Sequence, residues 1–245
     1  MKTFKQFIKK IPCIPSPIHF KQVSKSRLNE MVDNPDHWPS KGHGMNDHLL
    51  ADRPKLDTLT DNEYISKKLS SGQKMNSNEK SSATDYSGTE HAQSVNWSLL
   101  DAHDSGKEVK HSTIKHLDSA IKKNPLQHEV HVYSGAGFDP MKHMNDDKLM
   151  HSPAFISTTH SRRVAYNHAK PRAEPDNTAT SHIIHLHLKK GDPAINISHH
   201  SQYPGEHETV IGRNVTLQHH GYEDHPDGFN VGHKIRVHHM SIVKK

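Results

Sequence analysis

The spacing of apolar residues changes near Pro125, and this change restricts the folds open to the chain. Before Pro125, apolar residues recur at helical spacing, as in Ala92, Val95 and Leu99. After it, apolar and polar residues alternate one by one, beginning with residues 130–134. Few helical stretches interrupt this half, whereas parallel strands need crossover connections that are usually helical. We therefore predict an α+β fold in which N-terminal helices pack on a mostly antiparallel core.

The same patterns predict individual elements. A Thr60–Glu63 capping box indicates a helix that carries Tyr64, Ile65 and Leu69. Residues 70–88, rich in Ser, Asn and Gly, are expected to form a loop. Two further helices are expected around Ala92–Leu100, with Trp97 and Leu100 widening the apolar stripe, and around Ile114–Ile121, and a short one at residues 161–169. Strands are expected at residues 130–134, 152–159, 182–188, 194–197, 208–211, 215–219 and 234–243.

Composition indicates one packed domain with an extension. Hydrophobic residues make up 31% of the 245, enough for one core but not for tight packing throughout. We expect residues 1–55 to be a loosely ordered extension and residues 56–245 to be the domain. Residues 2–11 can form a short amphipathic helix, because Phe4, Phe7, Ile8 and Ile11 share one face. That helix is expected to fray or dock; a targeting or packaging tag, or a membrane-surface contact, is the alternative.

Several classes of protein are disfavoured. The single cysteine, Cys13, excludes an internal disulfide and fits a reducing compartment. No apolar run approaches the ~18 residues of a membrane span. A net charge of +5 fits either solubility or a preference for acidic partners, and we expect no direct contact with nucleic acid.

Histidine is unusually frequent, with 26 residues. The sequence contains no His-Glu-x-x-His motif and no cysteine pair, the common signatures of zinc sites. Doublets such as His199-His200, His219-His220 and His238-His239 fall in expected strands or turns, where one member of each should face water. We therefore predict solvated histidines and no metal site, with a metal-binding histidine-rich protein as a weaker alternative.

Three short segments carry polar groups at the ends of expected strands: residues 132–135, 155–159 and 203–210. The last contains Glu206 and Glu208, which would face the same way on a strand. Paired carboxylates can stabilise a cation and activate a nucleophile, and hydroxyls such as that of Ser157 can bind a ribose. Each pattern alone is common on solvated strands, so the signal lies in their order and spacing.

In this order the segments resemble the signature of the mono-ADP-ribosyltransferases, namely an arginine strand, a Ser-Thr-Ser strand and a Glu-x-Glu motif. The resemblance covers about residues 56–243 and implies two sheets around an NAD cleft, with NAD as substrate and no metal. It implies that Glu208 binds a ribose hydroxyl and stabilises positive charge on the ribose. It also implies that Glu206 orients an arginine acceptor, and that Ser157 holds Glu208 and the nicotinamide-side ribose.

The resemblance further implies an NAD-binding set around the cleft. Gly135 would bind the nicotinamide amide through its backbone, which glycine permits by allowing close approach. Thr158 and Thr159 would support the strand of Ser157. The implied NAD-binding residues are Tyr133, Ser134, Gly135, Phe155, Ser157, Thr158 and Thr159.

Ser134 departs from the family, because it stands where the family has an arginine that anchors an NAD phosphate. Losing one charge-assisted hydrogen bond costs about 1.5–3 kcal/mol. Arg162, Arg163 or Lys142 is expected to be near enough to act as a substitute cation.

The function expected from the resemblance is NAD-dependent protein-arginine mono-ADP-ribosylation with release of nicotinamide. The opening residues 1–7 resemble the starts of tailed-phage proteins. Phage enzymes of this kind modify bacterial host proteins such as RNA polymerase and translation proteins, so we expect action in the host cytoplasm, with possible carriage in the virion. The alternative is a catalytically weak or inactive relic of the same fold that binds NAD or protein, as a virion component.

Overall fold

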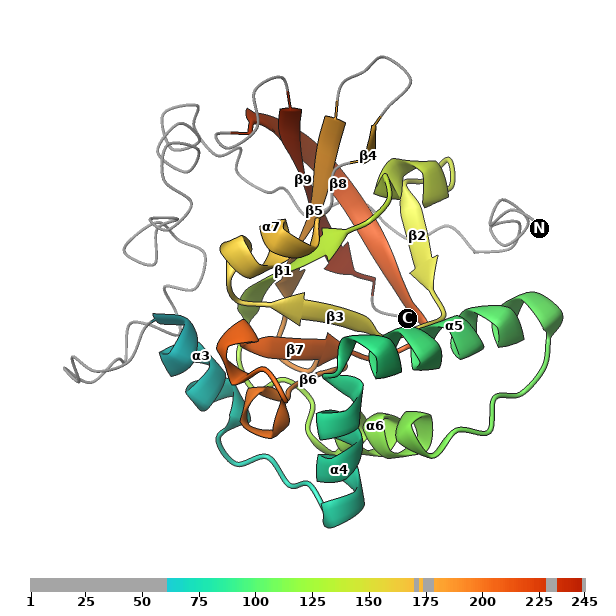
Figure 1. Ribbon diagram of the computed structural model, residues 1–245, viewed down its shortest axis with the longest axis vertical. Coiled ribbons are helices and arrows are strands. Elements are labelled where there is room, and N and C mark those ends of the chain that lie inside the picture. The colour runs from blue at the N-terminus through green and yellow to red at the C-terminus, as the bar shows by residue number, and fades with distance from the viewer. Residues whose placement is uncertain (1–60, 170–171, 174–178, 228–232, 244–245) are drawn as a thin grey trace.

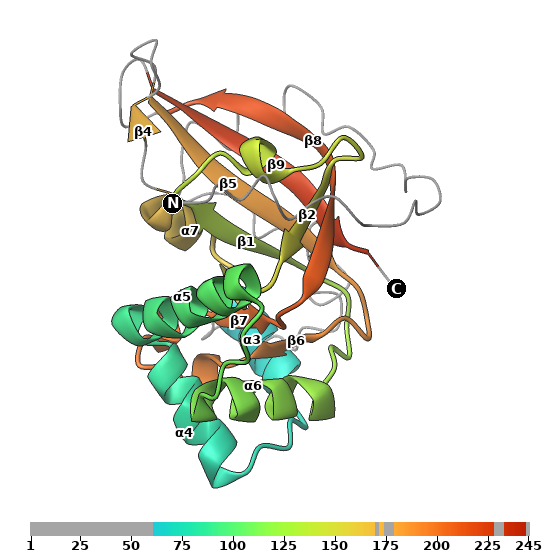
Figure 2. The ribbon, with the colours of Figure 1, turned by 90° about the vertical axis from the view of Figure 1, so that its right-hand side faces the viewer.

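The computed structural model describes residues 61–169, 172–173, 179–227 and 233–243. These residues form an α+β domain, as predicted. Helices α4, α5 and α6 gather at one end, and the long strands β5, β8 and β9 lie at the other (Figures 1 and 2). The expected extension over 1–55, its helix at 2–11 and the capping residue Thr60 lie outside the described residues. None of the helices described is both long and apolar enough to span a membrane.

Within the described residues, four helices precede the first strand. They are α3 (Asp61–Ser70), α4 (Ser77–Tyr86), α5 (Thr89–Ser105) and α6 (Ser112–Lys123). The prediction of a loop over residues 70–88 is wrong, because α4 lies within it. This helix begins at a capping box, in which Asn76 and Glu79 each bind the other's backbone N–H, and it buries Ala83 and Tyr86.

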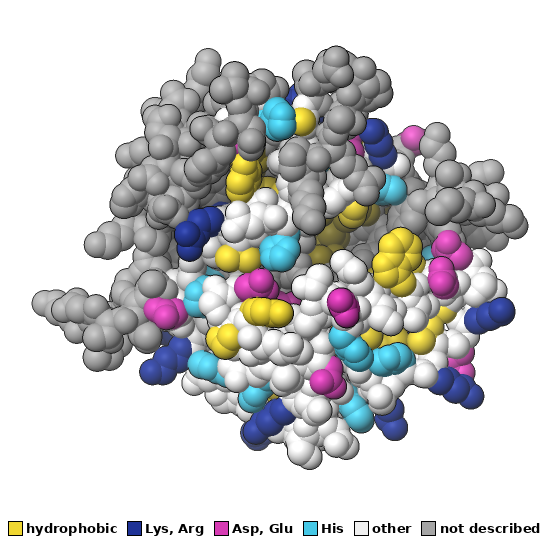
Figure 3. Space-filling model, viewed as in Figure 1, with side chains coloured by type: hydrophobic (Ala, Val, Ile, Leu, Met, Phe, Trp, Pro, Cys, Tyr) yellow, Lys and Arg dark blue, Asp and Glu magenta, His cyan; other side chains and the backbone are white. Residues whose placement is uncertain are grey.

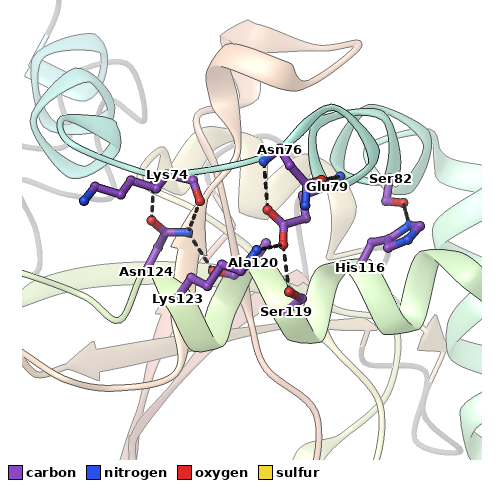
Figure 4. A network of polar contacts seen from close by, with 9 residues as sticks. All are labelled: Lys74, Asn76, Glu79, Ser82, His116, Ser119, Ala120, Lys123 and Asn124. Atoms are coloured by element: carbon purple, nitrogen blue, oxygen red, sulfur yellow. Dashed lines mark hydrogen bonds and ion pairs between the residues drawn. The ribbon is translucent and has the colours of Figure 1, made fainter.

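A buried polar network fastens α4 to α6 (Figure 4). Glu79 is only 1% exposed, and its Oε1 accepts hydrogen bonds from Ser119 Oγ at 2.7 Å and Lys123 Nζ at 2.6 Å. Beside it, Ser82 Oγ lies 3.1 Å from His116 Nδ1. The carboxylate thus links the first turn of α4 to α6 and fixes how α4 presents its last residue, Tyr86.

Helix α5 has a narrower apolar stripe than expected. Val95 and Leu99 are buried and Leu100 packs against them, but Trp97 is 65% exposed. The expected place of Trp97 in the stripe is wrong. Trp97 is two positions from both Val95 and Leu99, and two positions correspond to a rotation of about 200° around a helix of 3.6 residues per turn, so its side chain points away from theirs.

The second half of the chain supplies a mostly antiparallel sheet, as predicted. Its hydrogen-bonded order in the described residues is β2-β8-β9-β5-β1-β3-β7-β6, with β4 paired to β5, and only the β5–β9 pair is parallel. The strands are β1 (Val130–Ala136), β2 (Leu149–Ser152), β3 (Ile156–Thr159), β4 (Arg172–Ala173), β5 (Ala179–Leu188), β6 (Ala194–Asn196), β7 (Glu208–Ile211), β8 (Val215–Pro226) and β9 (His233–Ile242). Short helices are η3 (Pro140–His143), α7 (Arg162–His168), η4 (Ser198–His200) and η5 (Pro204–Glu206).

The strand expected over residues 152–159 is not continuous. Strand β2 ends at Ser152 and β3 begins at Ile156, so the expected strand is the end of one and the whole of the next. Pro153 has no N–H to give to a ladder, and Ser152 Oγ donates to the carbonyl of Ala154 at 2.9 Å, which turns the chain.

The sheet divides into two parts between β1 and β3. Tyr133 and Thr159 are the one partner pair that joins these strands in the described ladder. One apolar cluster, including Val132, Leu186 and Met240, lies against the β1-β5-β9-β8 part. A second, including Leu117 and Val210, fills the space between the helices and the smaller β3-β7-β6 part. The described strands therefore form one hydrogen-bonded sheet in two parts, where the sequence analysis expected two sheets.

Candidate active site

A cleft of about 770 Å³ lies where the two parts of the sheet meet α5 and α7. Cavities of a few hundred to about 1,000 Å³ are typical of small-molecule sites. On the face viewed in Figure 3, acidic and histidine side chains lie next to one another near the middle of the molecule. All three sequence motifs line the cleft, through Tyr133, Ser134, Gly135, Phe155, Ser157, Thr158, Thr159, Glu206 and Glu208.

Glu208 is the first residue of β7 and its side chain is almost fully buried, with 7% exposed. Burial, with added repulsion from Glu206, raises the pKa of Glu208 to about 7 even though Ser157 hydrogen-bonds to it. The carboxyl group therefore changes charge near neutral pH, and pKa values shifted in this way are frequent at functional sites.

Two residues that the sequence analysis missed hold Ser157. Its Oγ lies 3.3 Å from the hydroxyl oxygen of Tyr86, and Asn96 Nδ2 donates to that hydroxyl at 3.1 Å. The Tyr86 ring packs edge-on against Phe155, with centroids 5.7 Å apart. Tyr86 ends α4 and Asn96 lies on α5, so the helices position the strand that carries Ser157. The capping pattern at Asn76 and Glu79 was the sequence signal for α4.

Thr158 and Thr159 bind the backbone of the neighbouring segment. Thr158 Oγ1 donates to the carbonyl of Thr209, and Thr159 Oγ1 donates to the carbonyl of Glu206. The two hydroxyls therefore tie β3 to β7 and to the turn before it, which fixes where the Glu206 backbone lies.

Glu206 is in a turn and not on the strand of Glu208. It ends η5, and His207 follows in the left-handed conformation with φ of 51°. The expectation that both carboxylates project from one strand is therefore wrong, because Pro204 and Gly205 start a tight turn ahead of β7. Glu206 still lines the cleft with its side chain 36% exposed, and its Oε1 lies 3.5 Å from His168 Nε2.

Gly135 allows α7 to pack against β1. A Cβ atom there would lie 2.2 Å from the carbonyl oxygen of Ala165 and 2.5 Å from the amide nitrogen of Ala169. Glycine is thus needed for close approach of the helix, while the Gly135 backbone also lines the cleft.

The expected substitute cations do not line the cleft. Arg162 is 8% exposed, and its guanidinium lies over the Tyr133 ring, 4.9 Å from the centroid. Neither Arg163 nor Lys142 is among the described lining residues; the basic side chains there are His143, His151 and His168. Ser134 therefore faces a cleft whose described cationic candidates are imidazoles.

Comparison with protein families identifies a match over most of the chain. Residues 60–230 match the family model described as ADP-ribosyltransferase exoenzyme. A search of curated proteins found no match.

Solved structures share the fold. Plx2a, an ADP-ribosyltransferase toxin from Paenibacillus larvae, is 20% identical with a TM-score of 0.59, over 75% of this chain and 95% of that chain. The S. aureus protein C3stau2, solved with NAD, is 18% identical with a TM-score of 0.55, over 74% and 95% of the two chains. The C3 exoenzyme of Clostridium limosum is 16% identical with a TM-score of 0.55, over 75% and 93%.

Proposed function

This chain belongs to the ADP-ribosyltransferase exoenzyme family, and we propose that it transfers single ADP-ribose groups from NAD to arginine side chains of proteins. NAD is its substrate, and nicotinamide is the product that leaves. The observation that supports the proposal best is the difference between two carboxyl groups on one cleft: Glu208 is buried and bound to Ser157, while Glu206 is partly exposed beside it.

The two environments suit two roles in one transfer. As the bond between ribose C1′ and the nicotinamide nitrogen breaks, its electron pair leaves with nicotinamide and the ribose becomes oxocarbenium-like. Ionised Glu208, held by Ser157, stabilises this charge through its low-dielectric surroundings. A guanidinium nitrogen of the acceptor then bonds to C1′ and loses a proton, for which Glu206 at the cleft rim is the base.

The acceptor assignment is tested by Glu206→Gln. We expect this variant to lose protein labelling while it keeps some hydrolysis of NAD, because water needs less positioning than a guanidinium. Labelled NAD with bacterial lysate measures the first activity, and nicotinamide release without protein measures the second. Mass spectrometry should place ADP-ribose on arginine; modification mainly on Ser, Thr, Asn or Cys would contradict the assignment.

Ser134 favours a second candidate function, a catalytically weak or inactive relic that binds NAD or protein. The residue lines the cleft where the family pattern has an arginine, and the described lining holds histidines instead of arginine or lysine. The two candidates differ in how much NAD the cleft binds and turns over.

Ser134→Arg should tighten NAD binding by up to about 10–100-fold, the worth of one charge-assisted hydrogen bond of ~1.5–3 kcal/mol. Because Arg162 lies over Tyr133 and outside the cleft lining, Arg162→Ala and Ser134→Arg should have additive effects on NAD titration. An Arg162→Ala effect that shrinks in the Ser134→Arg background would identify Arg162 as the substitute anchor. If neither the parent chain nor the Ser134→Arg variant binds NAD detectably, the result would favour the relic over the enzyme.

We further propose that the acceptors are bacterial host proteins such as RNA polymerase or translation proteins, modified in the host cytoplasm. The phage-like opening residues support this assignment. Identification of the labelled proteins in bacterial lysate tests it, and labelling confined to the enzyme itself would contradict it.

A further inference from the structure

Three metal-ligating side chains meet beside the cleft, although no sequence motif predicted them. Asp139 follows β1, His182 lies on β5 and His238 lies on β9. One potential ligand atom from each lies within 4.8 Å of the other two. Within the described residues no other group of three histidine, cysteine or acidic side chains converges in this way.

The distances fit ligands of one ion. His182 Nδ1 lies 2.9 Å from His238 Nε2 and 3.9 Å from Asp139 Oδ1. Two ligands of a tetrahedral zinc at ~2.0–2.1 Å stand roughly 3.3 Å apart, between these two values. The longer distance exceeds that of a hydrogen bond, so direct bonding between Asp139 and His182 does not account for the convergence.

The surroundings hold two of these side chains in place. The backbone N–H of Met141 donates to Asp139 Oδ1 at 3.0 Å, so that Asp139 also caps η3. His238 is fully buried, and its second nitrogen, Nδ1, lies 3.3 Å from His219 Nε2. A ligating histidine commonly has its second nitrogen bonded in this way, which fixes its tautomer and orientation.

We propose that Asp139, His182 and His238 form a zinc site, with His219 as the residue that orients His238. Two imidazoles and one carboxylate are a usual ligand set for zinc, which takes nitrogen and oxygen ligands in tetrahedral geometry.

The site would brace one wall of the cleft. Gly137 and Phe138, directly before Asp139, line the cleft, as does His143 at the end of η3. Ile184, two residues from His182 on the same face of β5, lines it too. A bound ion would join this wall to β5 and β9. The inference concerns structure and is independent of the acceptor and of the transfer chemistry.

The opposite face of the sheet supplies a matched control. There His131, His185 and His239 also form a chain, with 2.9 Å between His131 Nδ1 and His185 Nε2 and 2.9 Å between His185 Nδ1 and His239 Nδ1. His239 adjoins His238 in sequence, and both lie on β9. If the protein bound metal only because it is rich in histidine, substitution of His238 and substitution of His239 would lower the metal affinity equally.

The experiment titrates Zn²⁺ into the full chain, without a histidine tag and after treatment with a chelator, by calorimetry. Elemental analysis and the visible spectrum of the Co²⁺ form accompany it. We expect one tight site per chain with a tetrahedral Co²⁺ spectrum. His238→Asn should weaken that site at least about 100-fold, whereas His239→Asn should leave it unchanged. Absence of a tight site, or equal loss in both variants, would overturn the proposal.

A milder variant covers the case in which His238→Asn does not fold. Asp139→Asn keeps an oxygen that can cap η3 but removes the negative charge. Zn²⁺ should raise the melting temperature of the parent chain clearly more than that of Asp139→Asn. An equal rise in both would show that Asp139 is not a ligand and would overturn the proposal.

Discussion

Replacing Glu208 with glutamine should lower the rate of nicotinamide release about 100-fold or more, with little change in NAD affinity. The carboxylate charge is needed most when positive charge develops on the ribose, and an amide of the same shape removes that interaction from the transition state. In this variant, turnover should therefore fall while the NAD affinity measured by titration stays nearly the same. Equal nicotinamide release by the variant and the parent chain would remove Glu208 from the mechanism.

The pH dependence gives a second measurement of the same group. With its pKa at about 7, Glu208 is largely protonated in mildly acidic solution, so turnover should rise with pH through about 7. Stability should move in the opposite direction. Because the folded pKa is above the ordinary value of 4.5, the folded state binds more protons between these values, and Glu208 lowers stability progressively as pH rises from about 4.5 to 7. Glu208→Gln should flatten both profiles over that window.

Replacing Gly135 with alanine should destabilise the domain by about 3 kcal/mol or more, at the upper end of overpacking effects. The new methyl group would lie 2.2 Å from the carbonyl oxygen of Ala165, and backbone atoms of α7 would have to move. Urea unfolding measures the loss.

Gly137→Ala is the matched control for this substitution. Gly137 is also on the cleft, but a Cβ atom there meets nothing within 4 Å. It should change stability far less. If the two variants unfold at the same urea concentration, the close packing of α7 on β1 is not what Gly135 provides.

The sequence predicted those helices and strands whose apolar residues show a clear helical or alternating spacing. The alternation that starts at Val130 indicates β1, and the spacing of Ile114, Leu117 and Ile121 indicates α6. Helix α4 was missed because its ten residues include four serine or threonine residues and few apolar ones. Its stability comes from contacts that no local pattern records, mainly the burial of Tyr86 and the bonds of Glu79 to α6.

The residues of the candidate site likewise fall into those that a sequence motif indicated and those that only the packing of the elements reveals. Residues of all three sequence motifs line one cleft, and their part in function stays a prediction. Tyr86 and Asn96 were missed, because their part in the site depends on how α4 and α5 pack against β3. Nearness in sequence to Thr159 suggests a place in the cleft for Arg162, whereas the structure places it over Tyr133. His182 and His238 are similarly brought together only by the pairing of β5 with β9.

The place of β9 in the sheet determines when the domain can acquire its cleft during synthesis. Strand β9 lies between β5 and β8, and β2 joins the described sheet through β8. Met150, His151 and Ser152 of β2 form part of the cleft wall. While residues 233–242 are still inside the ribosome, no strand can bridge β5 and β8, and the cleft wall formed by β2 is incomplete. Enzymatic activity should therefore appear only after β9 has been translated and has left the ribosome.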